Sequence, residues 1–132
     1  MEVMSNKVGK VIKIAGLNVW PHEQYMADRL ANAGYTVEFI KPSDKKYEST
    51  PDVLIDGEKW EMKSPRTSSL KAVRRNLKLA GWQSNKIVFT AKRMKGMPDK
   101  AVERELATQL LELPKIVAIK FITRHGKVID IG

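Results

Sequence analysis

Residues 50–65, TPDVLIDGEKWEMKSP, contain the strongest structural signal in the chain and decide the fold around them. Asp56-Gly57 stands between two runs of strand-forming residues, a pattern typical of a two-residue β-hairpin turn. The pattern predicts strands at 52–55 and 58–64, and Pro65 ends the second one.

The register of this hairpin predicts that acidic side chains face each other. A two-residue turn at Asp56-Gly57 places Asp52 directly opposite Glu61, with their Cβ atoms about 5 Å apart. Because side chains alternate along a strand, Glu61 and Lys63 project from one face. Trp60 and Met62 are expected to point the other way, into the core. Like charges opposite one another destabilise a sheet, so this pattern indicates a bound cation or an exposed edge that tolerates it.

Two carboxylates and an ammonium group on one face suit the cleavage of a phosphodiester bond. Asp52 and Glu61 are predicted to bind a divalent metal, most simply Mg²⁺, with Mn²⁺ and Zn²⁺ as alternatives. Such an ion binds a phosphate oxygen and lowers the pKa of a bound water. Lys63 is predicted to orient that water or to offset charge on the phosphate. The alternative for Lys63 is that it simply belongs to a basic surface.

Glu23 is the fourth candidate catalytic residue. Pro21 fits the first position of a helix over 21–32. Glu23 lies three residues before Met26 and seven before Leu30, so it shares the inward face of that helix. A structural explanation is also open, because a carboxylate in the first turn is stabilised by the helix dipole.

The formal net charge of +9 is concentrated in one part of the chain. Residues 63–95 contain ten Lys or Arg and no Asp or Glu, whereas the other residues contain 14 basic and 15 acidic ones. Such a basic segment attracts phosphates, so a nucleic-acid partner is predicted, with a merely solvated face as the alternative. The candidate nucleic-acid-binding residues are Arg66, Lys71, Arg74, Arg75, Lys78, Lys92 and Arg93. The basic loop 91–97 is interpreted either as a flap over substrate or as a solvated loop.

The remaining pattern predicts one α/β domain over residues 1–132, with 1–18 as an N-terminal extension. Further strands are expected at 36–40, 86–90, 116–122 and 128–131, with a short one within 8–15. Further helices are expected from Ser68 or Ser69 to 80 and from Pro98 to 113. This order indicates a central mixed β-sheet flanked by helices. Trp60 and Trp82 are interpreted as core or edge packing residues rather than as platforms for stacked bases.

Composition excludes several classes of protein. The chain has no cysteine, which excludes disulfides and thiolate metal sites. Its apolar runs are too short to span a bilayer, and its N-terminus lacks the apolar core of a signal peptide. No membrane partner is therefore expected.

The motifs together resemble a known superfamily. Pro51-Asp52, followed after the hairpin by Glu61-Met62-Lys63, resembles the PD-(D/E)xK nuclease signature. The flanking order adds the helix with Glu23, AGYTVEFI at 33–40, the basic helix, and QSNKIVF at 83–89. From residue 21 to the C-terminus, this order resembles the C-terminal toxin domains of contact-dependent growth inhibition systems.

The resemblance implies a restriction-endonuclease-like core and a metal-dependent endonuclease. It implies metal binding by Asp52 and Glu61, with the Met62 carbonyl as a further ligand. Lys63 takes the place of the catalytic lysine, and Glu23 matches the helical glutamate of many members.

The resemblance also implies a biological setting. Many of these domains are transfer-RNA nucleases, which implies RNA as substrate and the cytoplasm of a target cell as the site of action. The domain would arrive there as part of a larger protein. An immunity protein is the implied partner, and the basic charge predicts that its contacting face is acidic. The alternatives are a DNA endonuclease of a repair or mobile element, and a non-catalytic nucleic-acid-binding module.

Overall fold

The predicted hairpin is confirmed in the computed structural model, which describes residues 9–40 and 53–132. Its antiparallel strands are β3 (Val53–Ile55) and β4 (Glu58–Lys63). Asp56 and Gly57 have φ angles of 48° and 87°, the left-handed conformation that a type I′ turn requires. Asp56 N donates to Thr36 O at 2.8 Å, and Thr36 N donates to Asp56 Oδ1 at 2.8 Å. These two hydrogen bonds fix the turn against the neighbouring part of the sheet.

The hairpin register is the predicted one as far as the structure describes it. Val53 lies opposite Trp60. The next pair in this register would be Asp52 and Glu61. Asp52 lies outside the described residues, so this pairing stays a prediction.

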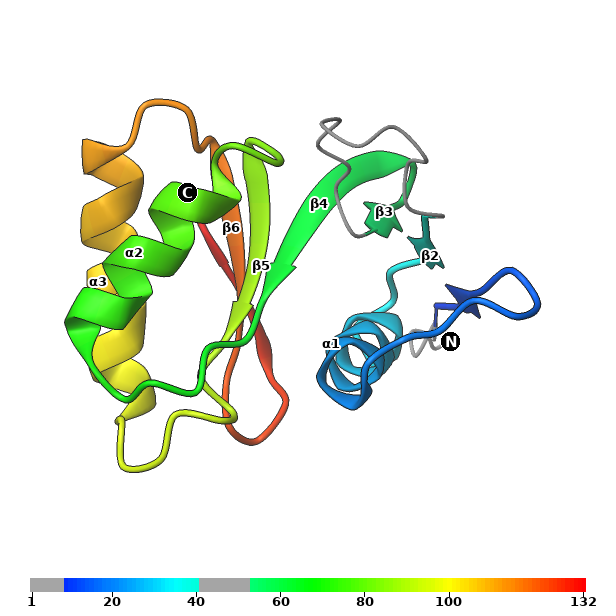
Figure 1. Ribbon diagram of the computed structural model, residues 1–132, viewed down its shortest axis with the longest axis horizontal. Helices are drawn as coiled ribbons and strands as arrows, with labels where there is room; N and C mark the ends of the chain where they lie inside the picture. The colour runs from blue at the N-terminus through cyan, green and yellow to red at the C-terminus, as the bar shows by residue number, and fades with distance from the viewer. Residues whose placement is uncertain (1–8, 41–52) are drawn as a thin grey trace, which may run out of the picture.

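The strands form one curled, mixed sheet in which they follow their order in the chain (Figure 1). Before the hairpin, β1 (Val11–Ile12) pairs parallel with β2 (Val37–Phe39), and β2 pairs antiparallel with β3. After it, β4, β5 (Lys86–Thr90) and β6 (Ala118–Ile122) are mutually parallel, and β7 (Val128–Ile131) runs antiparallel to β6. The mixed α/β architecture expected from the sequence is confirmed.

Helices cover both faces of the sheet (Figure 1). The helices are α1 (Pro21–Asn32), α2 (Leu70–Ala80) and α3 (Asp99–Glu112). Ser69 caps α2, because its Oγ accepts a hydrogen bond from Ala72 N at 3.1 Å. Among residues 9–40 and 53–132, no helix has both the length and the apolar composition needed to cross a membrane.

The sheet separates two apolar cores. The core beneath α2 and α3 contains Ile87 and Phe89 of β5, whereas the core beneath α1 contains Trp60 and Met62 of β4. Trp60 and Met62 are each 5% exposed, which confirms that they point into the core. Alternation along β4 therefore directs Glu61 and Lys63 to the face covered by α2.

Lys120 of β6 is a buried cation that joins distant parts of the chain. It is 7% exposed, and its Nζ donates to Asp130 Oδ1 at 2.7 Å and to the Tyr35 hydroxyl at 3.0 Å. Burial alone would lower the pKa of this ammonium group, but the hydrogen bonds to Asp130 and Tyr35 outweigh it and raise the pKa. The charged side chain thus ties β6 and β7 to the turn that follows α1.

Replacing Lys120 is expected to destabilise the domain in proportion to the contacts removed. Lys120→Ala should lower the free energy of unfolding by about 2 kcal/mol, and Lys120→Met, which keeps the aliphatic stem, by about 1 kcal/mol. Because the folded-state pKa is raised, the ionic contribution is present below the ordinary lysine pKa of about 10.4. It is lost as the pH rises through the folded-state value. Urea unfolding at neutral and at alkaline pH measures the free energy of unfolding and its dependence on pH. The control is Lys100→Ala, because Lys100 is exposed. An equal loss of stability in Lys100→Ala and Lys120→Ala would contradict this account of Lys120.

The turn glycine offers a second test of the fold. Gly57→Ala should lower the free energy of unfolding by about 1 kcal/mol, because alanine disfavours the left-handed conformation. No atom lies within 4 Å of an added Cβ there, so the loss would come from the backbone alone. The matched control is Gly81→Ala, because Gly81 has a helical φ of −60° and an added Cβ would meet only ordinary contacts. Urea unfolding that gives equal losses for both variants would refute this account of the turn.

Candidate functional site

Glu61 and Lys63 lie on the same face of β4, as predicted. Glu61 is 6% exposed, and Lys63 Nζ is 3.7 Å from Glu61 Oε2. Their neighbours on β5 are Ile87 and Phe89, both fully buried. A carboxylate removed from water in this way is costly unless cations or hydrogen bonds compensate it. The structure therefore brings two of the four predicted catalytic residues together at the edge of an apolar core.

Glu23 lies in the first turn of α1 and caps that helix. Its Oε1 accepts a hydrogen bond from Trp20 N at 3.0 Å, the structural role that a carboxylate at this position commonly has. α1 packs on the face of Trp60 and Met62, whereas Glu61 projects to the other face of the sheet. The catalytic role of Glu23 stays a prediction.

A metal site at Glu61 would depend on Asp52. Within residues 9–40 and 53–132, no three His, Asp or Glu side chains form a group that could hold a metal ion. Glu61 supplies a carboxylate of the kind that Mg²⁺ prefers, and the second predicted carboxylate lies outside the described residues. The donor chemistry fits a hard divalent cation, and its binding stays a prediction.

Two arginines line a hollow beside the end of β4. Arg66 and Arg93 form it together with Trp20, Pro21 and His22, and its volume is about 460 Å³. Arg93 Nε donates to Ser64 O at 2.9 Å and to Ser64 Oγ at 3.1 Å, and its Nη2 also donates to Ser64 O. Ser64 directly follows Lys63 in the chain. These hydrogen bonds therefore place this Arg66–Arg93 hollow next to the end of the strand that carries Glu61 and Lys63.

The electrostatics of the Arg66–Arg93 hollow favour an anion. Neither guanidinium group has an acidic partner within 4.0 Å in the part of the chain that the structure describes. Burial, and to a smaller extent the nearby Arg66 cation, lower the pKa of Arg93. A phosphate between the two groups would relieve this repulsion, and arginine suits phosphate by its planar set of donors.

The basic loop 91–97 is anchored at several points. Met94 is fully buried, Arg124 Nε donates to Met97 O at 3.1 Å, and Arg124 Nη2 donates to Met94 O. Lys92 is exposed, with its Nζ 5.4 Å from the centroid of the Tyr25 ring. These contacts connect the loop that carries Arg93 to Arg124, and the flap interpretation stays a prediction.

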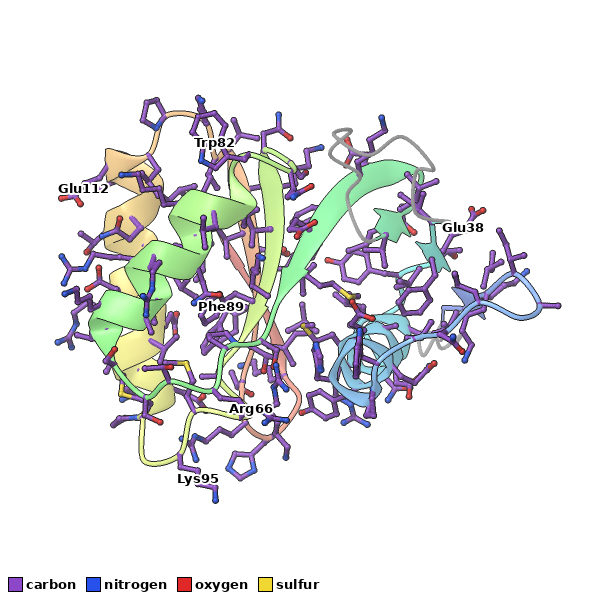
Figure 2. The ribbon with its side chains drawn as sticks, in the orientation of Figure 1. Glu38, Arg66, Trp82, Phe89, Lys95 and Glu112 are labelled. Atoms are coloured by element: carbon purple, nitrogen blue, oxygen red, sulfur yellow. The ribbon has the colours of Figure 1, made fainter. Side chains whose placement is uncertain are left out.

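The exposed side of α2 carries the other predicted nucleic-acid-binding residues. A groove of about 320 Å³, here called the α2 groove, is lined by Lys71, Arg74, Arg75, Lys78, Gln109 and Leu113. Arg74 Nε is 3.6 Å from Glu105 Oε2 of α3. Figure 2 shows Arg66 and Lys95 near the lower edge of the view and Trp82 near the upper edge, with α2 running between them. Six of the seven predicted residues thus lie at the Arg66–Arg93 hollow or along α2, whereas Lys92 lines neither of them.

Trp82 is a surface feature that the sequence interpretation missed. Its side chain is 65% exposed, whereas Trp60 is 5% exposed, so core packing is confirmed for Trp60 and wrong for Trp82. Trp82 follows Gly81, which ends α2, and so stands outside the apolar stripe of Leu77 and Ala80. That position beyond the helix end is the signal that could have identified it.

The fold of this chain is similar to that of a solved structure. A structure described as the CdiA-CT/CdiI toxin and immunity complex from Burkholderia pseudomallei has a similar chain, with a TM-score of 0.65. The match covers 93% of this chain and 96% of that one at 20% sequence identity, so the likeness shows the fold. No curated protein matches the chain in sequence.

The sequence itself shows the family. Residues 48–128 match the family described as the contact-dependent growth inhibition CdiA C-terminal domain, which is more than half of the chain. The protein belongs to this family.

Arg66 offers a direct test of the nucleic-acid interface that the sequence predicts. Arg66→Gln should weaken binding of an oligonucleotide about five- to tenfold and reduce the slope of log affinity against log salt by about one. Fluorescence anisotropy over a range of salt concentrations measures both quantities. Arg104→Gln, on the exposed side of α3, is the matched control. Equal losses of affinity in the two variants would show that binding depends on the net charge of the protein and not on a site at Arg66.

Proposed function

We propose that this domain is a metal-dependent nuclease that hydrolyses RNA, with transfer RNA as its substrate, and that it acts as a toxin. The observation that supports the proposal most is the buried Glu61 carboxylate with the half-buried Lys63 beside it, on a strand whose end adjoins the Arg66–Arg93 hollow. Assignment to the PD-(D/E)xK superfamily is part of the proposal.

The chemistry follows from the residues present. Glu61, together with Asp52, would hold a divalent cation, which when bound supplies Lewis-acid stabilisation and an acidified water. Lys63 would hold its ammonium group next to the negative charge that develops on the phosphate. Arg66 and Arg93 would bind a neighbouring phosphate and so orient the strand without reading its bases.

The biological setting follows from the family and from the surface charge. The structurally similar Burkholderia chain belongs to a toxin and immunity complex. By analogy, this domain would be delivered into target cells as part of a longer protein, and its producer would carry an immunity protein. Since the α2 groove and the Arg66–Arg93 hollow are basic, the contacting face of that partner would be acidic.

The proposal is tested by cleavage assays on total RNA and plasmid DNA, with Mg²⁺ and with a chelator. Wild type should cut transfer RNA only with the metal, and Glu61→Gln and Lys63→Ala should each lower the rate by about 100-fold or more. RNA binding should persist or strengthen in Glu61→Gln, because removing a carboxylate reduces repulsion of the phosphates.

Matched controls separate catalysis from charge. Glu38→Gln and Lys59→Ala change exposed residues on β2 and β4 and should leave the rate near that of wild type. Cleavage of DNA alone would keep the site and reassign its substrate. No cleavage of either polymer, with unchanged binding in Glu61→Gln and Lys63→Ala, would leave a basic binding module in place of an enzyme.

A further inference from the structure

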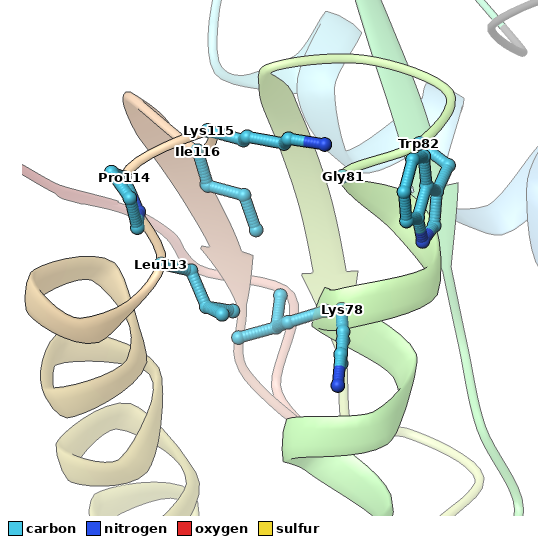
Figure 3. Close-up of a pocket in the computed structure, with 8 residues that line it drawn as sticks. Lys78, Gly81, Trp82, Leu113, Pro114, Lys115 and Ile116 are labelled. Carbon is cyan, nitrogen blue, oxygen red and sulfur yellow. The ribbon is translucent and has the colours of Figure 1, made fainter.

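Another hollow, here called the Trp82 hollow, lies between the end of α2 and the segment before β6 (Figure 3). Its volume is about 220 Å³. Figure 3 shows the indole of Trp82 on one side and Leu113, Pro114 and Ile116 on the other. Lys115 extends across the opening towards Trp82, and Lys78 stands at the opposite rim. The hollow therefore has apolar walls and cationic edges.

Trp82 does not contribute to the packing of the core. Its indole is 65% exposed, and the α2 residues packed in the core are Ala72, Val73, Leu77 and Ala80. Such an apolar ring in water leaves surface that a ligand can cover. The wall opposite the indole is also apolar, so a flat group inserted between them would lose contact with water on both of its faces.

The charge around the hollow selects the chemistry of its ligand. Lys78 and Lys115 are exposed, and no acidic residue lines the hollow. Lys78 and Leu113 also line the α2 groove, so the hollow and the groove open onto one basic surface. A polyanion that follows α2 would therefore pass the mouth of the hollow.

We propose that the Trp82 hollow is a subsite for one unpaired nucleobase, while the adjoining phosphates lie on Lys78 and in the α2 groove. A nucleobase is planar, has apolar faces and is attached to a phosphate chain, so it matches the walls and the rim together. The inference rests on the proposed nucleic-acid substrate and deepens it, because it requires a strand with an unstacked base. It does not depend on the catalytic role of Glu61 or Lys63.

Lys115 is the side chain that would have to move. Its Nζ lies 4.0 Å from the centroid of the Trp82 ring, a cation–π contact at an exposed position. Such contacts are weak in water, and a base that stacks on the ring would release the ammonium group to a neighbouring phosphate. Lys115 would then exchange the ring for a phosphate without losing a favourable contact.

The experiment uses short RNA strands that contain one 2-aminopurine, a base whose fluorescence is quenched when it stacks. Binding is measured in the presence of a chelator, so that cleavage does not interfere. Trp82→Ala should weaken binding of the single strand about tenfold and abolish the quenching, whereas Trp82→Phe should keep most of both. Binding of a fully paired duplex of the same sequence should stay unchanged, because its bases are stacked within the helix.

Two controls make the result decisive. Leu79→Ala removes another exposed apolar side chain of α2 that does not line the hollow, and it should bind both RNAs like wild type. Thermal unfolding checks that Trp82→Ala is folded. Unchanged single-strand binding and quenching in Trp82→Ala would overturn the subsite and leave the hollow to a protein ligand. Equal losses for strand and duplex would also overturn it, whether or not the domain proves to be a nuclease.

Discussion

The register of β4 is the constraint on which the arrangement of this domain depends. β4 pairs with β3 on one side and β5 on the other, so it joins the N-terminal and C-terminal parts of the sheet. With Trp60 and Met62 fixed in the core beneath α1, Glu61 and Lys63 must face α2. A shift by one residue would bury the two charged side chains in that core and remove Trp60 and Met62 from it, so the apolar contacts of Trp60 and Met62 oppose such a shift. The type I′ turn at Asp56 and Gly57 fixes the register locally.

The parallel order of β4, β5 and β6 explains how basic residues distant in sequence come together. The carboxyl ends of parallel neighbours lie at one edge of the sheet, so the segment after β4 and the loop after β5 meet there. Arg66 and Arg93 belong to these two segments, and the bonds from Arg93 to Ser64 join them. α2 is the connection between β4 and β5, and it carries the basic surface from that edge to the Trp82 hollow at the other.

Sequence reasoning predicted best where local chemistry leaves few choices. The Asp56-Gly57 turn, the start of α1 at Pro21 and the Ser69 cap each depend on a few neighbouring residues, and each is confirmed. Reasoning failed for Trp82, because the exposure of an aromatic side chain depends on which elements pack around it. For Glu23 the sequence left a catalytic role and a structural role at the helix start open; the structure shows the structural one, and the catalytic role stays a prediction.

The sequence by itself determined the α/β class, the hairpin register at Asp56-Gly57, the alternation that puts Glu61 beside Lys63, and the basic segment over residues 63–95. These properties follow from turn conformation, strand alternation and charge, which act over a few residues. Only the tertiary structure decided that Arg66 and Arg93 share one hollow, that Lys120 joins Tyr35 to Asp130, and that the indole of Trp82 faces solvent. Each of these depends on contacts between segments distant along the chain, and their geometry is fixed only when the whole sheet and its helices pack together.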